Sequence, residues 1–323
     1  MHIIDYKYLS VITTKQEDTF MHDLVTIYRK VRKTLKFALK PYLDSVGNLN
    51  FYPHPPKMSD LEILSLSITA ECLEIDSESL LWAKIKQDYL TCFPNLIHLT
   101  RYNARRKRLK QWLEFACDWM SHQIPCSDQV FIVDSIPIPV CKISREKQST
   151  VCRKPGDEFR ASKGFSATEK QYYIGYKMHL ITSSSGVFQQ VRILPAHVHD
   201  ITFLKTLEQT HLIDCKLIGD RAYRSDPLQL ALFEDFEIDL QVPYRKNQRD
   251  FKEYPQAWSI QRKRIETVFS QYCDQHKIKR NLAKSFTGLQ TRILTKVAAM
   301  TFKQYWNFTH NRNIGKTKYA LAA

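Results

Sequence analysis

Apolar positions in the first part of the chain recur at steps of three and four residues, the spacing of one face of a helix. The pattern predicts a helix over residues 18–40. A second helix is predicted to open at Ser59, because Ser59-Asp60-Leu61-Glu62 has the form of a capping box. Further helices are predicted to begin near Ser77 and after Thr100, whose hydroxyl can cap a first turn. Residues 1–125 are therefore expected to form an all-helical region.

The pattern changes after Pro125. Residues 130–133 form a short continuous apolar run, typical of a central strand covered on both faces. Apolar and polar residues alternate over 174–180, and the turn sequence Ser183-Ser184-Ser185-Gly186 leads into a second apolar stretch, so a hairpin is predicted. Farther along, the pattern predicts helices over 201–209, 227–236 and 256–277, and strands over 216–219 and 238–242.

The segment between the first two predicted strands, residues 141–171, is basic, contains Ser and Gly, and shows no clear period. Such a segment is more typical of a loop or a mobile arm than of a separate domain. The expected fold class is thus α/β, with a mixed sheet flanked by helices, preceded by the all-helical region.

Two of the predicted strands are apolar until they end in a carboxylate. Residues 130–133 end at Asp134, and residues 217–219 end at Asp220. A charge directly after a buried run is unusual, although a single Asp in such a place often only forms a turn. The pair of them suggests a site at the strand ends, where a crevice can form in an α/β sheet.

A third carboxylate, Glu266, lies in the long predicted helix beside the apolar residues Ile265, Val268 and Phe269. By itself it could simply pair with Arg262, four residues earlier on the same helix. Together, three carboxylates from two strands and a helix can hold two hard divalent cations about 4 Å apart, an arrangement suited to phosphodiester chemistry. Asp134, Asp220 and Glu266 are therefore candidate catalytic residues and metal ligands.

Composition supports a globular protein that meets a polyanion. The chain has 43% hydrophobic residues, and its 48 Lys+Arg against 33 Asp+Glu give a net charge of +15. No amphipathic anchor, leader-like start or long apolar stretch accompanies this charge, so we expect an intracellular protein that binds nucleic acid rather than a membrane. The eight cysteines form no C-x-x-C pair, which argues against a zinc ribbon or a disulfide framework.

Six of the ten residues from 101 to 110 are basic, more than the polar face of an ordinary surface helix needs. We interpret this segment as a phosphate-contacting or recognition helix. Three further cations near the carboxylates are expected to touch DNA. The candidate DNA-binding residues are Arg101, Arg105, Arg106, Lys107, Arg108, Lys110, Arg221, Arg262 and Lys263.

Weaker candidates follow the third predicted strand and the second aspartate. His199 and Asp200 could support a metal or DNA role, but the position of Asp200 favours a cap for the helix that starts at residue 201. Tyr223 lies just beyond Asp220. These three residues are kept as a possible second layer around the carboxylates.

Four sequence blocks carry a resemblance to a known family. They are residues 133–141 (VDSIPIPVC), 173–180 (YIGYKMHL), 219–223 (GDRAY) and 264–269 (RIETVF). In order and spacing, with 86 residues from Asp134 to Asp220 and 46 from Asp220 to Glu266, they resemble the motifs of bacterial insertion-sequence DDE transposases, most closely insertion-sequence family 982. The similarity extends into the helical part through residues 57–62 and 102–106.

The resemblance implies a ribonuclease-H-like catalytic domain with a mixed five-stranded sheet over residues 126–285, between a helical DNA-binding region (1–125) and a C-terminal helical extension (286–323). It implies two Mg²⁺ ions, replaceable by Mn²⁺, held by the three carboxylates. It further implies cleavage at the element's inverted repeats, transfer of the strand into target DNA, a homodimer in the synaptic complex and action at the nucleoid in the cytoplasm. No small-molecule substrate is expected.

Two alternatives stay open on the sequence. A structure-specific nuclease or resolvase on the same core would cut DNA without joining it. A defective, transposase-derived protein would bind DNA without cutting it, although the presence of all three acids counts against this.

Overall fold

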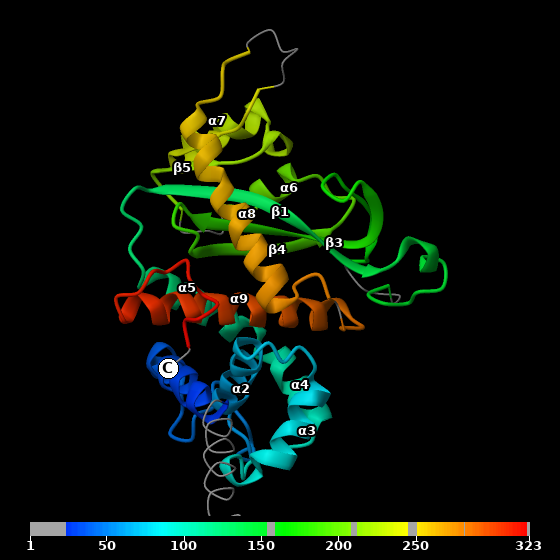
Figure 1. Ribbon diagram of the computed structural model, residues 1–323, viewed down its shortest axis with the longest axis vertical. Helices are drawn as coiled ribbons and strands as arrows, with labels where there is room; N and C mark the ends of the chain where they lie inside the picture. The colour runs from blue at the N-terminus through cyan, green and yellow to red at the C-terminus, as the bar shows by residue number, and fades with distance from the viewer. Residues whose placement is uncertain (1–23, 154–158, 208–211, 245–250, 281, 322–323) are drawn as a thin grey trace, which may run out of the picture. The chain divides into compact units, whose positions relative to one another are not determined.

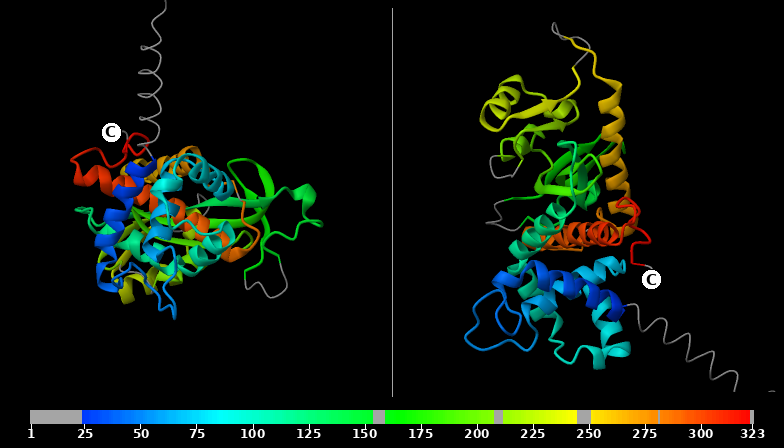
Figure 2. Two further views of the ribbon diagram at one scale, coloured as in Figure 1. Left: turned by 90° about the horizontal axis from the view of Figure 1, so that it is seen from below. Right: turned by 90° about the vertical axis from the view of Figure 1, so that its left-hand side faces the viewer.

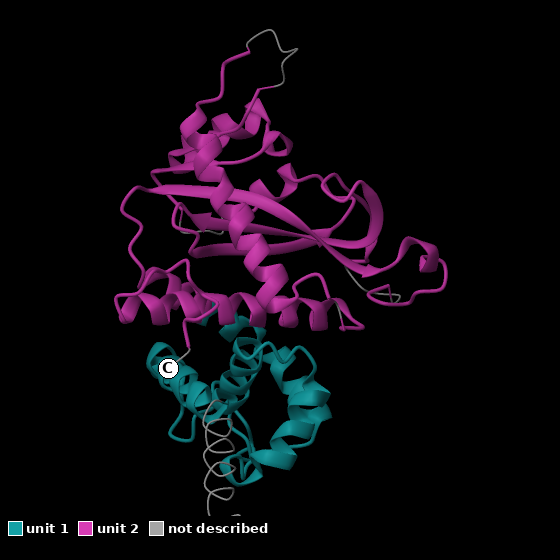
Figure 3. Cartoon of the chain, viewed as in Figure 1, with its two compact units in different colours: residues 1–116 teal, residues 117–323 magenta. Residues whose placement is uncertain are grey.

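The computed structural model describes residues 24–153, 159–207, 212–244, 251–280 and 282–321. The chain divides into two compact units, residues 1–116 and 117–323 (Figure 3). Each unit is described by itself. In the described part of the chain, no helix is both long enough and apolar enough to cross a membrane. All eight cysteines are free thiols.

Over its described residues, 24–116, unit 1 holds helices and no strand, as its apolar spacing predicts. A helix covers residues 24–38, and its predicted start at Asp18 lies outside the described residues. The other elements are η1 (Lys40–Tyr42), α2 (Asp60–Cys72), α3 (Glu78–Asp88), η2 (Leu90–Cys92) and α4 (Leu99–Arg108), and α5 (Lys110–His122) begins in this unit.

The predicted helix starts are confirmed in two cases and wrong in one. At Ser59 the hydroxyl accepts from the Glu62 amide, and the Glu62 carboxylate accepts from the Ser59 amide, which is the full capping box. Ser77 caps α3 by accepting from the amide of Leu80. The prediction that Thr100 caps α4 is wrong, because the cap is His98, whose ring nitrogen accepts from the Thr100 amide.

Unit 2 is built on a six-stranded mixed sheet in which β2, β3, β1, β5 and β6 follow one another and β4 pairs with β3 beside β2 (Figure 1). The predicted hairpin is confirmed as the antiparallel pair of β3 and β4. The strands are β1 (Val130–Cys141), β2 (Ser162–Ser166), β3 (Gln171–Ser183), β4 (Phe188–Pro195), β5 (Cys215–Ile218) and β6 (Ile238–Gln241).

The basic insertion is more ordered than a loop prediction allows. It holds η3 (Ile143–Arg145) and supplies β2, which pairs antiparallel with the start of β3 and gives the sheet a sixth strand. The sequence pattern missed β2 because its five residues, Ser-Lys-Gly-Phe-Ser, are too short and too polar for alternation to stand out. Residues 154–158 of the insertion lie outside the described part.

Helices cover both faces of the sheet (Figure 2). On one face, side chains of β1, β5 and β6 form an apolar core with α6 (Ile201–Leu204), η5 (Arg221–Tyr223) and α7 (Asp226–Phe236). On the other face, α8 (Gln256–His276) packs along β1, and α9 (Phe286–Thr309) contacts α8 and β4. Residues 208–211, at the end of the predicted helix 201–209, lie outside the described part.

Position 175 in β3 must be glycine for a steric reason. A Cβ built on Gly175 would lie 2.1 Å from the backbone oxygen of Ile138 on β1, at the place where the β1–β3 register shifts between Pro139 and Cys141. Because no side chain fits there, only glycine lets the two strands approach.

Candidate active site

The two strand-borne aspartates lie side by side because of the register between β1 and β5. The strands are parallel, and Val130, Phe131 and Ile132 pair with Lys216, Leu217 and Ile218. This register joins each residue to one that follows 86 positions later, and 86 is also the separation of Asp134 and Asp220. Continued by two residues, it places both carboxylates at the same level on strands about 4.8 Å apart.

The two aspartates also face the same side of the sheet. Phe131 and Val133 belong to the core under α6 and α7, and so does Leu217, the partner of Phe131. Because side chains alternate along a strand, Asp134 and Asp220 project toward the other face, which α8 covers.

Glu266 comes from α8 on that same face. It is flanked by buried Ile265 and Val268, but its own side chain is 57% exposed. The i,i+4 ion pair with Arg262 is present, with 3.5 Å between guanidinium and carboxylate. This pair does not exclude a catalytic role, since Arg262 also influences the pKa of both aspartates.

The electrostatics of the three acids reflect one shared site. Burial, with smaller contributions from the charges of Asp220 and Glu266, raises the pKa of Asp134 to about 7, although the Ser135 amide and Arg262 oppose the rise. Burial also raises the pKa of Asp220, against a hydrogen bond from the Ala222 amide and the charge of Arg262. Arg262 thus acts on both aspartates, and the charges of Asp220 and Glu266 both act on Asp134.

The donor set fits hard divalent cations in type, since it consists of carboxylate oxygens from Asp134 inside β1, Asp220 after β5 and Glu266 on α8. The prediction that the first strand ends at Asp134 is wrong, because β1 continues to Cys141. A bound cation would offset both the burial that raises the pKa of Asp134 and the smaller repulsion from Asp220 and Glu266. Among the described residues, however, no three His, Cys, Asp or Glu side chains lie close enough together to form a finished metal site. Glu266, held by Arg262, is the most exposed of the three acids.

The prediction that Asp200 caps α6 is wrong. Its side chain makes no cap hydrogen bond, and its backbone is already helical. The carboxylate instead accepts from the ammonium group of Lys177 on β3, at 2.5 Å, because an ion pair in a half-buried place outweighs a local turn interaction. His199, the residue before it, is exposed.

Sequence reasoning missed two residues on β3, Lys177 and His179. His179 is fully buried and its Nδ1 lies 3.0 Å from the hydroxyl of Tyr223. The signal was present in the sequence, because polar residues at alternate positions of an otherwise apolar strand must find partners when they face a core. Tyr223 is likewise fully buried. Of the expected second layer, Tyr223 and Asp200 both lie near the His179 ring, whereas His199 is exposed.

The basic residues of segment 101–110 fall mainly into two groups, those in ion pairs and those exposed to solvent. Arg105 donates to the carboxylate of Asp60 at 2.6 Å and to the Met58 carbonyl, and Arg106 pairs with Glu78 at 2.6 Å. Both arginines are therefore used within unit 1. Arg101, Lys107 and Arg108 are exposed on α4, and Lys110 is half-buried at the start of α5. Near the carboxylates, Arg221 and Lys263 are exposed.

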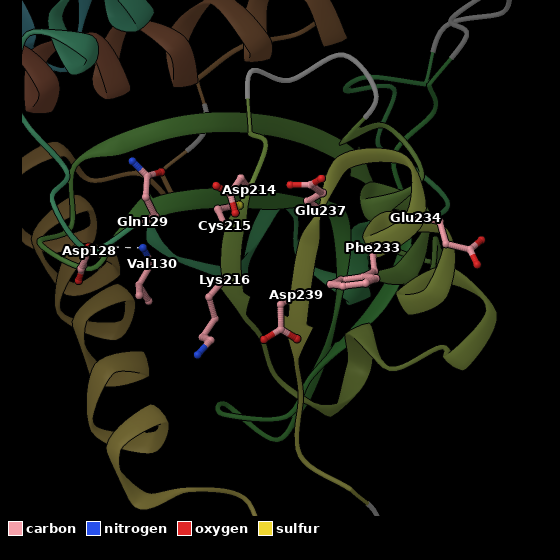
Figure 4. Close-up of a pocket in the computed structure, with 10 residues that line it drawn as sticks. All are labelled: Asp128, Gln129, Val130, Asp214, Cys215, Lys216, Phe233, Glu234, Glu237 and Asp239. Atoms are coloured by element: carbon pink, nitrogen blue, oxygen red, sulfur yellow. Dashed lines mark hydrogen bonds between the residues drawn. The ribbon is translucent and has the colours of Figure 1, made fainter.

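A cavity of about 650 Å³ lies elsewhere in unit 2 and is unsuited to DNA (Figure 4). It opens where β1, β5 and β6 begin, whereas Asp134 lies farther along β1 and Asp220 comes after the last residue of β5. Five of its lining residues are acidic and one, Lys216, is basic, a charge that repels phosphates. Its lining comprises Asp128, Gln129, Val130, Asp214, Cys215, Lys216, Phe233, Glu234, Glu237 and Asp239.

Comparison with known proteins agrees with the geometry of the carboxylates. A search of curated proteins and a search of solved structures each returned no match. The family model of the transposase DDE domain matches residues 125–302, more than half of the chain. That span holds Asp134 on β1, Asp220 just after β5 and Glu266 on α8. The sheet with its covering helices is accordingly a ribonuclease-H-like domain, and the chain belongs to the family of DDE transposases, enzymes that act on DNA.

Proposed function

We propose that this transposase cuts DNA at the ends of an insertion sequence and transfers the freed strand into target DNA. The observation that supports it most is the common register that brings Asp134 and Asp220 to one level, on the face covered by the helix of Glu266. The four sequence blocks further support insertion-sequence family 982 as the nearest group.

We assign the binding of two Mg²⁺ ions, replaceable by Mn²⁺, to Asp134, Asp220 and Glu266. Such ions polarise a phosphodiester and stabilise charge on its attacking and leaving oxygens. Asp134 lies within β1, and Asp220 lies between β5 and η5, whose first turn it caps, so the placement of these two ligands needs no rearrangement of the chain. Glu266 is the adjustable one, since it is exposed and its partner Arg262 can turn to a phosphate.

We assign DNA contacts to basic side chains that do not pair with a buried acid. Around the carboxylates these are Arg221, Arg262 and Lys263, and on α4 they are Arg101, Lys107 and Arg108. We leave Arg105 and Arg106 out of this set because each neutralises an acid inside unit 1. Lys110 stays a weaker candidate, being half-buried. Phosphate contacts of this kind give affinity that falls steeply with salt.

The remaining parts of the proposal follow from the substrate. Two ends of an element must be brought together for joined products, which supports a homodimer in the synaptic complex. Chromosomal DNA as substrate supports action at the nucleoid. Neither a small-molecule substrate nor a membrane enters the scheme.

The experiment is incubation of the purified full chain with a labelled DNA fragment that carries the element's ends, with Mg²⁺ or with EDTA. We expect cleavage and joining of 3′ ends with Mg²⁺ only. Asp134→Asn, Asp220→Asn or Glu266→Gln should each lower the rate at least about a hundredfold, because several kcal/mol of transition-state stabilisation depend on the ions.

A matched control is Asp239→Asn, which removes a carboxylate from β6 of the same sheet but at the acidic cavity. It should cleave at the rate of the unaltered chain. Cleavage that survives all three active-site substitutions would refute the proposal. Products that are cut but never joined would indicate a nuclease or resolvase, and salt-sensitive binding without any Mg²⁺-dependent product would indicate a defective transposase.

A further inference from the structure

A buried polar network lies on the face of the sheet opposite the three catalytic acids. Lys177 and His179 occupy alternate positions of β3, on the side of the apolar core that includes Ile181. The His179 ring stacks on Phe203 of α6, with 5.0 Å between the ring centroids and 20° between the planes. Its Nδ1 atom lies 3.0 Å from the Tyr223 hydroxyl. One face of the imidazole and its Nδ1 atom are therefore in contact with neighbours, whereas its buried Nε2 atom makes no hydrogen bond within the described part of the chain.

The other end of the network is the ion pair of Lys177 and Asp200. Asp200 accepts from Lys177 at 2.5 Å and lies 3.8 Å from Nε2 of His179. The two charged side chains are only 18% and 16% exposed, so water screens the pair weakly. Lys177 thereby neutralises a fourth carboxylate whose charge would otherwise add to that of Asp220.

This network is connected to the catalytic aspartates through the backbone. Tyr223 is the last residue of η5, and Asp220 is the cap of that turn, accepting from the Ala222 amide at 2.8 Å. His179 pairs in the β1–β3 ladder with Ser135, the residue after Asp134. The hydrogen bond between His179 and Tyr223 thus crosses β1 and joins β3 to the turn that begins at Asp220.

The protonation states suit a fixed hydrogen bond. Burial lowers the pKa of His179 to about 4, so the ring is neutral at pH 7. Burial, followed by the charges of Asp200, Asp134 and Asp220, raises the pKa of Tyr223 far above its usual range, so its hydroxyl keeps its proton. The neutral ring can then accept from Tyr223 at Nδ1 while its Nε2 proton faces Asp200.

We propose that Lys177, His179, Asp200 and Tyr223 form a positioning network that holds the turn after β5 against β3 and so fixes the carboxylate of Asp220 beside that of Asp134 for divalent-cation binding. The proposal rests on the metal-dependent function assigned above. These residues touch neither DNA nor cation, and they act through the orientation of Asp220. Its carboxylate must stay within a fraction of an ångström of its place for two ligands to share an ion.

The test compares Tyr223→Phe with the unaltered full chain. The substitution removes one oxygen atom and leaves the ring in its core. We measure Mn²⁺ binding to the DNA-free protein by electron paramagnetic resonance, and the Mg²⁺ concentration that gives half-maximal cleavage. The Kd for Mn²⁺ and the half-maximal Mg²⁺ concentration should both rise about tenfold, within the 10- to 100-fold range usual for residues that support metal ligands.

The control for lost stability is Tyr176→Phe. Tyr176 is also fully buried on β3, and its hydroxyl donates to the Phe159 carbonyl at 2.8 Å, away from the carboxylates. Tyr176→Phe should lower the urea midpoint by a similar amount but leave Mn²⁺ affinity unchanged. If the two variants weaken Mn²⁺ binding equally, or if neither does, the network has no positioning role.

A second variant tests whether His179 and Tyr223 act on Mn²⁺ binding through their shared hydrogen bond. His179→Gln should weaken Mn²⁺ binding in the unaltered chain but add little in the Tyr223→Phe background, because both changes break one bond. Additive effects would overturn the proposal. Unchanged Mn²⁺ binding in Tyr223→Phe, with an unaltered chain that cleaves DNA, rejects the network and keeps the function. If Tyr223→Phe weakens Mn²⁺ binding but the unaltered chain never cleaves DNA, the network is kept and the proposed function is rejected.

Discussion

The basic segment of α4 offers a prediction that separates structure from DNA binding within a few residues. Arg105 and Arg108 carry the same charge on the same helix, but Arg105 pairs with Asp60 and Arg108 is exposed. Arg105→Gln should therefore destabilise unit 1 and Arg108→Gln should not. Arg108→Gln should weaken DNA binding and reduce its salt dependence by about one counterion.

The size of the stability effect follows from the surroundings of Asp60. This carboxylate is fully buried, and removal of one partner from a buried ion pair costs about 3–5 kcal/mol. Asp60 keeps hydrogen bonds from the amides of Leu49 and Asn50 and from the Tyr52 hydroxyl, so the lower end applies. About 3 kcal/mol corresponds to a fall in Tm of roughly 12 to 24 °C for a unit of this size.

The assay combines a urea melt followed by circular dichroism with DNA affinity measured at several salt concentrations. Both variants carry the same substitution, so each serves as the control for the other. A normal urea midpoint for Arg105→Gln would refute the structural assignment. A normal salt slope for Arg108→Gln would refute its contact with phosphate.

Three further predictions concern the fold around these sites. Gly175→Ala should yield insoluble or unfolded protein on expression, because its Cβ would lie 2.1 Å from the Ile138 oxygen. As pH falls from 6.5 to 4, urea melts should show a loss on the order of 3 kcal/mol that His179→Gln removes, because the unfolded chain binds a proton that buried His179 refuses. Ser59→Ala should lower the urea-derived stability by about 1 kcal/mol through loss of the capping box with Glu62, and an unchanged midpoint would contradict this.

The parts of the site that sequence could predict are those set by local chemistry. Asp134 and Asp220 stand out because a charge rarely follows directly on a buried apolar run, and the capping box at Ser59 can be read from four residues. The distant partners could not be predicted. Asp60 pairs with Arg105, 45 positions away in the chain. Asp200 pairs with Lys177 and does not cap α6 as expected.

Contacts between residues far apart in the chain cannot be predicted from their spacing. Spacing along the chain says how many residues separate two groups, but not which ones a ladder of hydrogen bonds places opposite each other. The same limit applies to β2, whose five residues become a strand only because β3 offers an open edge.

The register between β1 and β5 also sets which changes of length the catalytic domain can tolerate. Residues added to the connections between Asp134 and Asp220 leave the two strands in their ladder, and the entropy of a longer loop grows only slowly with its length. One residue added inside β1 before Asp134, in contrast, would turn that carboxylate to the other face of the sheet. The connections between elements within the 86-residue interval can thus accept reporter tags or new DNA-contacting segments, while the short stretch from Val130 to Asp134 cannot accept an added residue.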